Sequence, residues 1–309
     1  MNKGIQMYLY THPDCENHKL AQHPERPERL RAVINRLEET GMTQDMKVKL
    51  AEELSNDVLI HVHPSKYVET INRSKPKIST VHLDPDTYMG PGSLRAAKLA
   101  AGACVTAVSD IIREKTDRAF CAIRPPGHHA EVAAAMGFCI FNNIALAAET
   151  ALAHSDINRV AIVDFDVHHC NGTVDIFKDR PEVLVCSSFQ ENYYPYRYLD
   201  FSNEHIVNSP LPKGTDGKSF RAAIERDWLP ALDSHQPDFL LISAGFDAHE
   251  QDPLAELCLH EADYSWITAE LLCIATNHSQ GRVISTLEGG YDLSALASSV
   301  EAHVSALMQ

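Results

Sequence analysis

Several features are scarce in this sequence, and each scarcity argues against a class of protein. No apolar run approaches the roughly 18–20 residues that span a bilayer, so we expect no membrane partner. The first ten residues carry no long apolar core typical of a signal peptide. The eight cysteines include no Cys-x-x-Cys pair, and most lie in apolar segments, as buried free thiols do. Together these features predict a cytoplasmic protein.

Positive charge is also scarce. The chain has 27 Lys and Arg against 42 Asp and Glu, which gives a formal net charge of −15 at pH 7. A nucleic-acid-binding protein usually carries a basic patch, and none is visible, so we expect no nucleic acid partner. An acidic surface keeps a protein soluble, and it can also steer cationic ligands toward a cleft.

The sequence contains no repeat, low-complexity tract or flexible linker, so we predict one catalytic domain spanning residues 1–309. Short apolar runs alternate with segments of helical periodicity. The predicted strands are 7–10, 119–123, 160–165, 183–187, 239–243 and 283–287. The predicted helices are 29–39, 93–114, 142–153, 220–232, 262–277 and 293–307. This order predicts an α/β fold with a mainly parallel central sheet flanked by helices on both faces.

Polar motifs follow four of the predicted strands. In order along the chain they are R-P-P-G-H-H, D-F-D-V-H-H, A-G-F-D with a later D-P, and E-G-G-Y. Ligands bind outside the carboxyl ends of the strands in open α/β sheets. We therefore expect these motifs to form one functional site.

The D-x-H pattern is a candidate metal site. Residues two apart in an extended chain face the same side, so Asp166 and His168 can point at one cation. Asp252 is the best third ligand, because it lies in a turn-like segment after another strand and Pro253 restricts its backbone. Carboxylate and imidazole ligands with one open position suit a catalytic zinc ion. Taken alone, the pattern favours turn hydrogen bonds, and the convergence of the motifs after the other strands reverses this interpretation.

The other motifs suit proton transfer. His128 and His129 are adjacent, so their side chains diverge, and they are better placed as acid, base or electrostatic partner than as ligands to one metal. Asp164 lies in an apolar strand, where a carboxylate needs a partner such as an imidazole N–H or a monovalent cation. The Tyr291 hydroxyl, after two glycines, is a candidate oxyanion donor.

The motifs together resemble a known family. R-P-P-G-H-H, G-F-C-I-F-N-N, D-F-D-V-H-H-C-N-G-T, A-G-F-D, L-E-G-G-Y and an early H-P-E-R-P-E-R-L are similar to the zinc-dependent histone deacetylase superfamily. The resemblance runs from about residue 8 to residue 293 and implies the arginase/deacetylase fold. It is closest to class II deacetylases, bacterial deacetylase-like enzymes and acetylpolyamine amidohydrolases.

The resemblance implies a role for particular residues. It implies one catalytic Zn²⁺ held by Asp166, His168 and Asp252. The implied catalytic residues are His129 as base and acid, Asn171 as its support, His128 as electrostatic partner, Asp164 behind it, and Tyr291 as oxyanion donor. The implied substrate tunnel includes Gly137, Phe138, Tyr194 and Leu259. A structural K⁺ is implied near Asp164, Asp166 and Ser187.

The sequence departs from the family pattern in two places. Cys170 stands where the family usually has glycine after the tandem histidines, and residues 187–210 lack the usual His-containing Phe-Pro-Gly segment. The second departure affects the expected tunnel wall.

These features predict a zinc-dependent amidohydrolase that removes acetyl groups from N-acylated amines. The expected substrate is a small cationic amide such as an acetylpolyamine, whose second ammonium would meet Asp84 and Asp86 with Glu256 or Glu261. Acetyl-lysine in peptides is the alternative substrate. An arginase-like two-metal ureohydrolase and a non-catalytic binding protein of the same fold are alternatives of other classes. The sequence does not indicate an oligomeric state.

Overall fold

The computed structural model describes residues 6–309, and its core is an eight-stranded sheet. Residues 1–5 lie outside the described range. They are the start of the predicted domain and part of the first ten residues, for which no signal peptide is expected. All neighbouring strands of this sheet pair in parallel. Their spatial order is β2 (Lys47–Leu50), β1 (Met7–Thr11), β5 (Arg118–Cys121), β10 (Val283–Leu287), β9 (Phe239–Ala244), β6 (Val160–Asp164), β7 (Val183–Gln190) and β8 (Ile206–Leu211).

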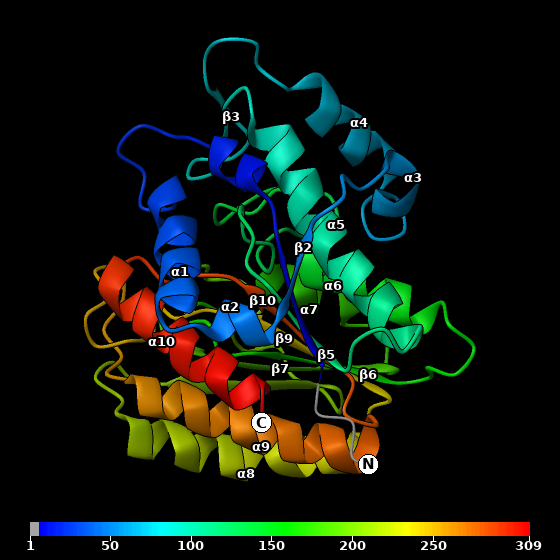
Figure 1. Ribbon diagram of the computed structural model, residues 1–309, viewed down its shortest axis with the longest axis vertical. Coiled ribbons are helices and arrows are strands. Elements are labelled where there is room, and N and C mark those ends of the chain that lie inside the picture. Colours follow the sequence, from blue (N-terminus) through cyan, green and yellow to red (C-terminus); the bar gives the residue numbers. More distant parts are fainter. Residues whose placement is uncertain (1–5) are drawn as a thin grey trace.

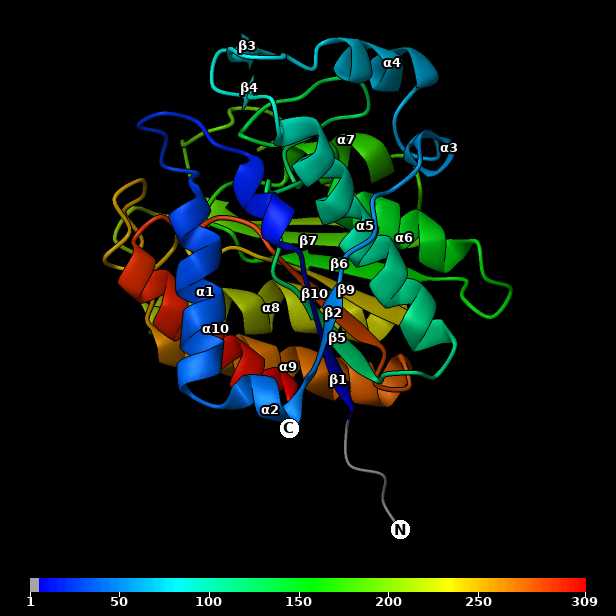
Figure 2. The same cartoon turned by 45° about the horizontal axis from the view of Figure 1, so that its top comes forward.

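Helices cover both faces of the sheet, as the alternating sequence pattern predicts (Figures 1 and 2). One face carries α8 (Gly217–His235), α9 (Glu261–His278) and α10 (Leu293–Leu307), with α1 (Pro27–Glu39) packed on α10. The other face carries α5 (Ser93–Ile112), α6 (Asn143–Leu152) and α7 (Asn171–Phe177). The central strands are buried on both sides, which explains why their sequences are continuous apolar runs.

A smaller segment lies beyond the carboxyl ends of the strands, at the top of both views. It contains the short helices α3 (Asn56–Leu59) and α4 (Ser65–Arg73), and the two-stranded ribbon of β3 (Val81–His82) and β4 (Tyr88–Met89). Two further short elements, η1 (Pro13–Asn17) and α2 (Met42–Asp45), flank α1 in sequence. No helix within residues 6–309 is both long and apolar enough to cross a membrane.

The predicted fold class and all six predicted strands are confirmed, with end shifts of up to three residues. The two edge strands were not predicted, for a physical reason. β2 exposes most of its side chains, and β8 contains Pro210, which is tolerated at a sheet edge because a ladder hydrogen bond is not required there. Edge strands therefore lack the buried apolar signature that identifies the central ones.

Candidate active site

The motifs that follow β5, β6, β9 and β10 converge at one edge of the sheet, because these four strands are parallel neighbours. Asp166, His168 and Asp247 place their ligand atoms within 4.8 Å of one another. His168 Nδ1 lies 3.0 Å from Asp166 Oδ1 and 3.3 Å from Asp247 Oδ2. The D-x-H pair therefore does point at one place, as the sequence predicts, and Asp247 joins it.

Asp252 lies at the neighbouring rim and is outside this compact group. Its Oδ2 accepts the backbone N–H of Tyr291 at 2.7 Å, and its Oδ1 accepts that of Leu254 at 2.9 Å. Burial and the nearby charge of Asp247 raise the pKa of Asp252 to about 7. Asp252 is therefore close enough to interact with the cluster electrostatically, and its assignment as a metal ligand stays a prediction.

The donor set fits a divalent cation. Asp247 Oδ2 is buried and has no hydrogen-bond partner, although its other oxygen accepts the Val167 N–H at 2.9 Å. Burial and the charge of Asp166 raise the pKa of Asp247, so this pair of carboxylates repels in the absence of a cation. A Cβ at Gly289 would lie 1.9 Å from Asp247 Oδ2, so only glycine leaves this space free. A bound cation would neutralise the excess negative charge.

His128 is held by a buried carboxylate. Its Nδ1 lies 2.9 Å from Asp164 Oδ2, and its Nε2 lies 3.9 Å from Asp166 Oδ1. Burial opposes the charged imidazolium, but the negative charges of Asp164 and Asp166 outweigh burial and raise the pKa of His128 to about 10. Asp164 thus lies behind His128, at the predicted position. In this environment the His128 side chain is a charged imidazolium.

His129 lies in a different environment. Burial and the positive charges of His128 and His168 lower its pKa well below the usual value. Its Nδ1 lies 2.6 Å from Asn171 Oδ1, and Asn171 in turn donates from Nδ2 to Glu131 Oε1 at 2.8 Å. Because the amide N–H₂ faces Glu131, the carbonyl oxygen must face the imidazole, so His129 Nδ1 carries a proton. The lone pair is then on Nε2.

Glu131 is a residue that the sequence reasoning missed. It is buried, and its second oxygen receives Arg197 Nη1 at 2.6 Å. Glu288 was also missed, although it lies in the quoted E-G-G-Y motif. Its Oε2 accepts the backbone N–H groups of Gly127 at 2.7 Å and His128 at 3.2 Å, so it connects two strand ends. The sequence contained a signal for both residues. Glu131 directly follows the H-H-A motif, and Glu288 directly precedes G-G-Y, and an acidic residue next to such a motif needs a partner when it is buried.

Tyr291 is positioned by its backbone and by a buried arginine. Its N–H is bound to Asp252, and Arg29 lies 4.8 Å from the centre of its ring. Arg29 also donates to the carbonyls of Gly290 and Glu288, both at 2.5 Å. Gly290 has φ 123°, a conformation that glycine alone adopts readily. The loop is therefore fixed at three points, with the phenol ring facing the cavity described next.

A narrow cavity of about 270 Å³ leads to this cluster. Three of the predicted tunnel residues, Gly137, Phe138 and Tyr194, line it. The other lining residues are His129, His168, Tyr291, Asp86, Tyr193, Pro253 and Leu254. The Tyr194 ring is perpendicular to that of His129, with centroids 5.2 Å apart. The aromatic walls suit a linear aliphatic chain.

The fourth predicted tunnel residue lies elsewhere. Leu259 is fully buried and is not part of the cavity lining, while Leu254 takes a lining position. The reason is local: Leu259 pairs with His249 in an isolated bridge, and its N–H donates to Ala248, so it faces the core. Tyr193 lines the wall by stacking on His168 and donating its hydroxyl to the Leu254 carbonyl.

Two further residues, His169 and Cys170, directly follow the D-x-H pattern. His169 points away from the cluster: its Nε2 lies 3.1 Å from Asn208 Oδ1 and its ring packs on Phe189. Burial lowers its pKa to about 4, so it is a neutral structural residue. Cys170, in the position where the family usually has glycine, is fully buried, and its N–H donates to Ser187 Oγ at 3.4 Å.

The acidic residues expected near the tunnel mouth separate into two groups. Asp86 lines the cavity, and its Oδ1 accepts the Gly137 N–H at 3.0 Å, with Asp84 next to it in the same turn. Glu256 binds Lys213, and Glu261 accepts the Ser298 hydroxyl at 2.7 Å, and neither lines the cavity. Only the Asp84–Asp86 side of the mouth is therefore acidic.

Comparisons with known proteins agree with this arrangement. Residues 23–307 match the histone deacetylase domain family. A histone deacetylase-like amidohydrolase of Pseudomonas aeruginosa is 36% identical over 278 residues, which cover 88% of this chain and 73% of that protein. A probable deacetylase of Archaeoglobus fulgidus is 34% identical, with 88% and 77% covered.

Plant proteins are similar as well. Histone deacetylase 15 of Arabidopsis thaliana is 37% identical over 99% of this chain, which spans 56% of that relative's length. The crystal structure of the HDA15 HD domain superimposes with a TM-score of 0.91 at 35% identity, covering 98% of this chain and 90% of that one. The likeness therefore includes both the sheet and the loops that carry the cluster.

Proposed function

The chain belongs to the histone deacetylase family and is a hydrolase acting on amides, and we propose that it removes acetyl groups from linear N-acetylated amines. One observation carries this proposal: a single cavity is lined by His129, His168 and Tyr291, which are a neutral imidazole, a candidate metal ligand and a phenol. This is the set of groups that amide hydrolysis with an oxyanion intermediate needs.

Asp166, His168 and Asp252 are the proposed zinc ligands, with Asp247 as the nearest further carboxylate. Zinc bound there supplies Lewis acidity, which activates a water molecule and polarises the amide carbonyl. The Gly289 N–H donates to Asp166 Oδ2 at 2.8 Å, and the His168 N–H donates to Asp166 Oδ1 at 2.9 Å, so both carboxylate oxygens of Asp166 are oriented by the backbone.

His129 is the proposed general base and acid. The hydrogen bond from its Nδ1 to Asn171 leaves the Nε2 lone pair to accept the proton of the attacking water. The same Nε2 then donates that proton to the nitrogen of the leaving amine, so the ring returns to its starting state. The charge on His128, whose ring centre is 4.0 Å away, keeps His129 neutral before the reaction.

Tyr291 is the proposed oxyanion donor. Burial raises the pKa of its phenol well above the usual value, so the hydroxyl keeps its proton and can donate it in a hydrogen bond. The backbone of Tyr291 is held by Asp252 and the ring by Arg29, so the hydroxyl does not need to be ordered when the tetrahedral intermediate forms.

Two further proposals concern a second ion and the location of the protein. We propose a structural K⁺ near Asp164, Asp166 and Ser187, supported by the pairing of Asp164 with Ser187 across β6 and β7 and by the complete burial of Asp164. We also propose a cytoplasmic location, supported by the eight cysteines, all of which are free thiols.

We propose a small cationic amine as the substrate, because acidic residues lie on one side of the cavity. Asp86 lines the cavity entrance and can meet a second ammonium of an acetylpolyamine or the α-ammonium of acetyl-lysine. Acetate release from acetylputrescine, acetylspermidine, an acetyl-lysine peptide and longer acyl analogues should be compared by kcat/KM with the zinc-loaded protein. A higher kcat/KM for the doubly charged amines would support the role of Asp86.

The same panel, extended by arginine, separates the other classes. We expect hydrolysis of acetyl amines and no urea release from arginine, because the group of Asp166, His168 and Asp247 with a neighbouring tyrosine does not provide a bridged two-metal centre. A folded, zinc-loaded protein that hydrolyses none of the acyl amines would refute the proposed function and favour a binding protein. Urea release from arginine would favour the ureohydrolase.

A further inference from the structure

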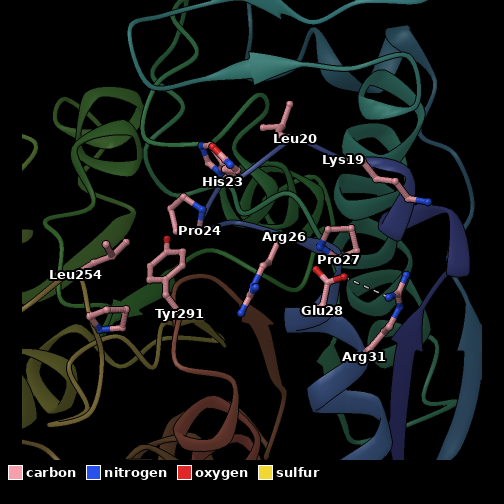
Figure 3. A pocket seen from close by; sticks show the side chains of 12 residues that line it. Lys19, Leu20, His23, Pro24, Arg26, Pro27, Glu28, Arg31, Leu254 and Tyr291 are labelled. Carbon is pink, nitrogen blue, oxygen red and sulfur yellow. Dashed lines mark hydrogen bonds and ion pairs between the residues drawn. The ribbon is translucent and has the colours of Figure 1, made fainter.

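A second and larger hollow adjoins the mouth of the tunnel. It has a volume of about 750 Å³ and is formed by the segment before α1, the first turns of α1 and the loop after β9 (Figure 3). We call it the arginine groove. Its lining residues are Lys19, Leu20, Gln22, His23, Pro24, Arg26, Pro27, Glu28, Arg31, Pro253, Leu254 and Tyr291.

The arginine groove is continuous with the tunnel. Pro253, Leu254 and Tyr291 line both hollows, so they form the boundary between them. His23, another groove residue, packs on the tunnel residue Phe138 with ring centroids 4.5 Å apart. A substrate whose acetylated arm occupies the tunnel therefore extends its other end toward the groove without leaving the protein surface.

The charge of the groove is opposite to that of the whole protein. It contains three cations, Lys19, Arg26 and Arg31, and a single carboxylate, Glu28, in a chain of formal net charge −15. Arg31 is neutralised by Glu16 at 2.6 Å and Glu28 at 3.3 Å, the latter pair drawn in Figure 3. Within residues 6–309, Lys19 and Arg26 form no ion pair and no side-chain hydrogen bond.

The backbone adds to this positive potential. Arg26 is the N-cap residue of α1, a 13-residue helix, and it supplies no capping side chain. Unpaired N–H groups and the helix dipole make the amino end of a helix favourable for an anion. Lys19, Arg26 and this helix end therefore line one hollow, in which Figure 3 shows the Lys19 and Arg26 side chains pointing to different sides.

We propose that the arginine groove binds a carboxylate on the substrate, held by Arg26 and favoured by the additional positive charge of Lys19, while the acetylated amine occupies the tunnel. This inference rests on the proposed function and makes it more specific. It assigns the substrate class as acetylated amino acids or peptides that carry a carboxylate near the acetylated side chain. It also predicts that acetylpolyamines, which have no anionic group, leave this groove unused.

The test compares two substrates that differ only in the anionic group. These are Nα-formyl-Nε-acetyl-lysine with a free carboxylate and its neutral carboxamide, assayed by acetate release with the zinc-loaded protein. We expect kcat/KM to be about fivefold higher for the carboxylate, in the range of an exposed ion pair. The difference should lie in KM, because Arg26 and Lys19 have no proposed role in the chemical step, and it should decrease at high salt.

Variants locate the effect. Arg26→Gln and Lys19→Gln should each reduce the carboxylate-to-carboxamide ratio, and the double variant should bring it to about one. Both side chains are exposed, and neither forms an ion pair or a side-chain hydrogen bond within residues 6–309. Arg113→Gln is the matched control, because it removes the same charge from an exposed arginine at the end of α5, ahead of the amino end of β5, and it should retain the ratio.

The outcomes separate the two proposals. If the wild-type protein hydrolyses both substrates equally and Arg26→Gln changes neither, the groove assignment is wrong and the deacetylase function stands. If neither substrate is hydrolysed, the deacetylase function fails. Binding of the same carboxylate and carboxamide, measured by calorimetry, then decides the groove: equal affinities overturn it, and tighter carboxylate binding that Arg26→Gln abolishes supports it.

Discussion

Two buried clusters of charge lie at the carboxyl edge of the sheet, and they are built differently. In the supporting cluster, Glu25 receives Arg124 at 2.5 Å through both carboxylate oxygens and Arg29 at 3.0 Å. Burial opposes ionisation of Glu25, but Arg124, His18 and Arg29 outweigh it and lower its pKa to about 2. Positive charge equals or exceeds negative charge there, and the carboxylate is fully partnered.

The catalytic cluster has the opposite balance. In the part of the chain that the structure describes, Asp164, Asp166, Asp247 and Asp252 meet two imidazoles and no arginine or lysine, and Oδ2 of Asp247 has no hydrogen-bond partner, although His168 Nδ1 lies 3.3 Å from it. Burial raises the pKa of Asp164 to about 6 and that of Asp252 to about 7. The comparison shows that burial of carboxylates does not by itself indicate a metal site. An uncompensated carboxylate with an open oxygen does, since a fold has no structural reason to keep it.

Removal of the metal should produce the largest effect and should act on the catalytic cluster alone. A chelator should abolish acetate release and lower Tm by about 5 °C, because a bound cation stabilises the folded state. Zinc should restore both. Asp166→Asn should lose the chelator-dependent Tm shift.

The same measurement distinguishes the two candidate third ligands. Zinc content after dialysis, determined by atomic absorption, should fall in Asp252→Asn and be retained in Asp247→Asn. The opposite result would make Asp247 the ligand. A Tm that does not depend on metal in the wild-type protein would contradict the proposed site altogether.

Disruption of the supporting cluster should affect stability more than chemistry. Arg124→Met leaves the buried Glu25 short of its main partner, which should cost about 3–5 kcal/mol in the free energy of unfolding. Arg36→Met, which breaks a partly exposed pair with Glu301, is the control and should cost at most about 1 kcal/mol. Urea denaturation measures both. Equal losses would show that the supporting cluster is not structural.

Removal of the Tyr291 hydroxyl tests the opposite case, a change in chemistry without a change in stability. Tyr291→Phe keeps the ring contact with Arg29 and should lower kcat roughly a hundredfold, the range for loss of one oxyanion donor. Its urea midpoint should match that of the wild-type protein. Full activity in this variant would exclude the oxyanion role.

The smallest expected effect concerns Glu131, which connects Arg197 to the Asn171 amide and through it to His129, the proposed base. Glu131→Gln should lower kcat about tenfold with little change in KM, because it disturbs the orientation of the Asn171 amide that fixes His129. Arg197→Gln, which removes only the outer pair with Glu131, should have a weaker effect. The pH profile of kcat is the second measurement, since a purely structural loss would not shift it.

The sequence alone determines the central part of the fold. Continuous apolar runs identify β5, β6, β9 and β10, because strands covered on both faces cannot alternate with polar residues. The motifs after these strands indicate the edge at which the site lies. His128, His129 and Tyr291 are predicted site residues on this basis, and the structure places the two imidazoles side by side and brings His129 and Tyr291 to one cavity.

Only the tertiary structure decides which groups meet there. Nothing in local spacing indicates that Asp247 joins Asp166, that Glu131 holds Asn171, or that Leu254 faces the tunnel while Leu259 faces the core. The first two outcomes depend on contacts between segments that lie 40 or more residues apart, such as Asn171 with Glu131. Periodicity describes one element at a time, whereas a cavity, its charge and its unpaired atoms are properties of several elements packed together.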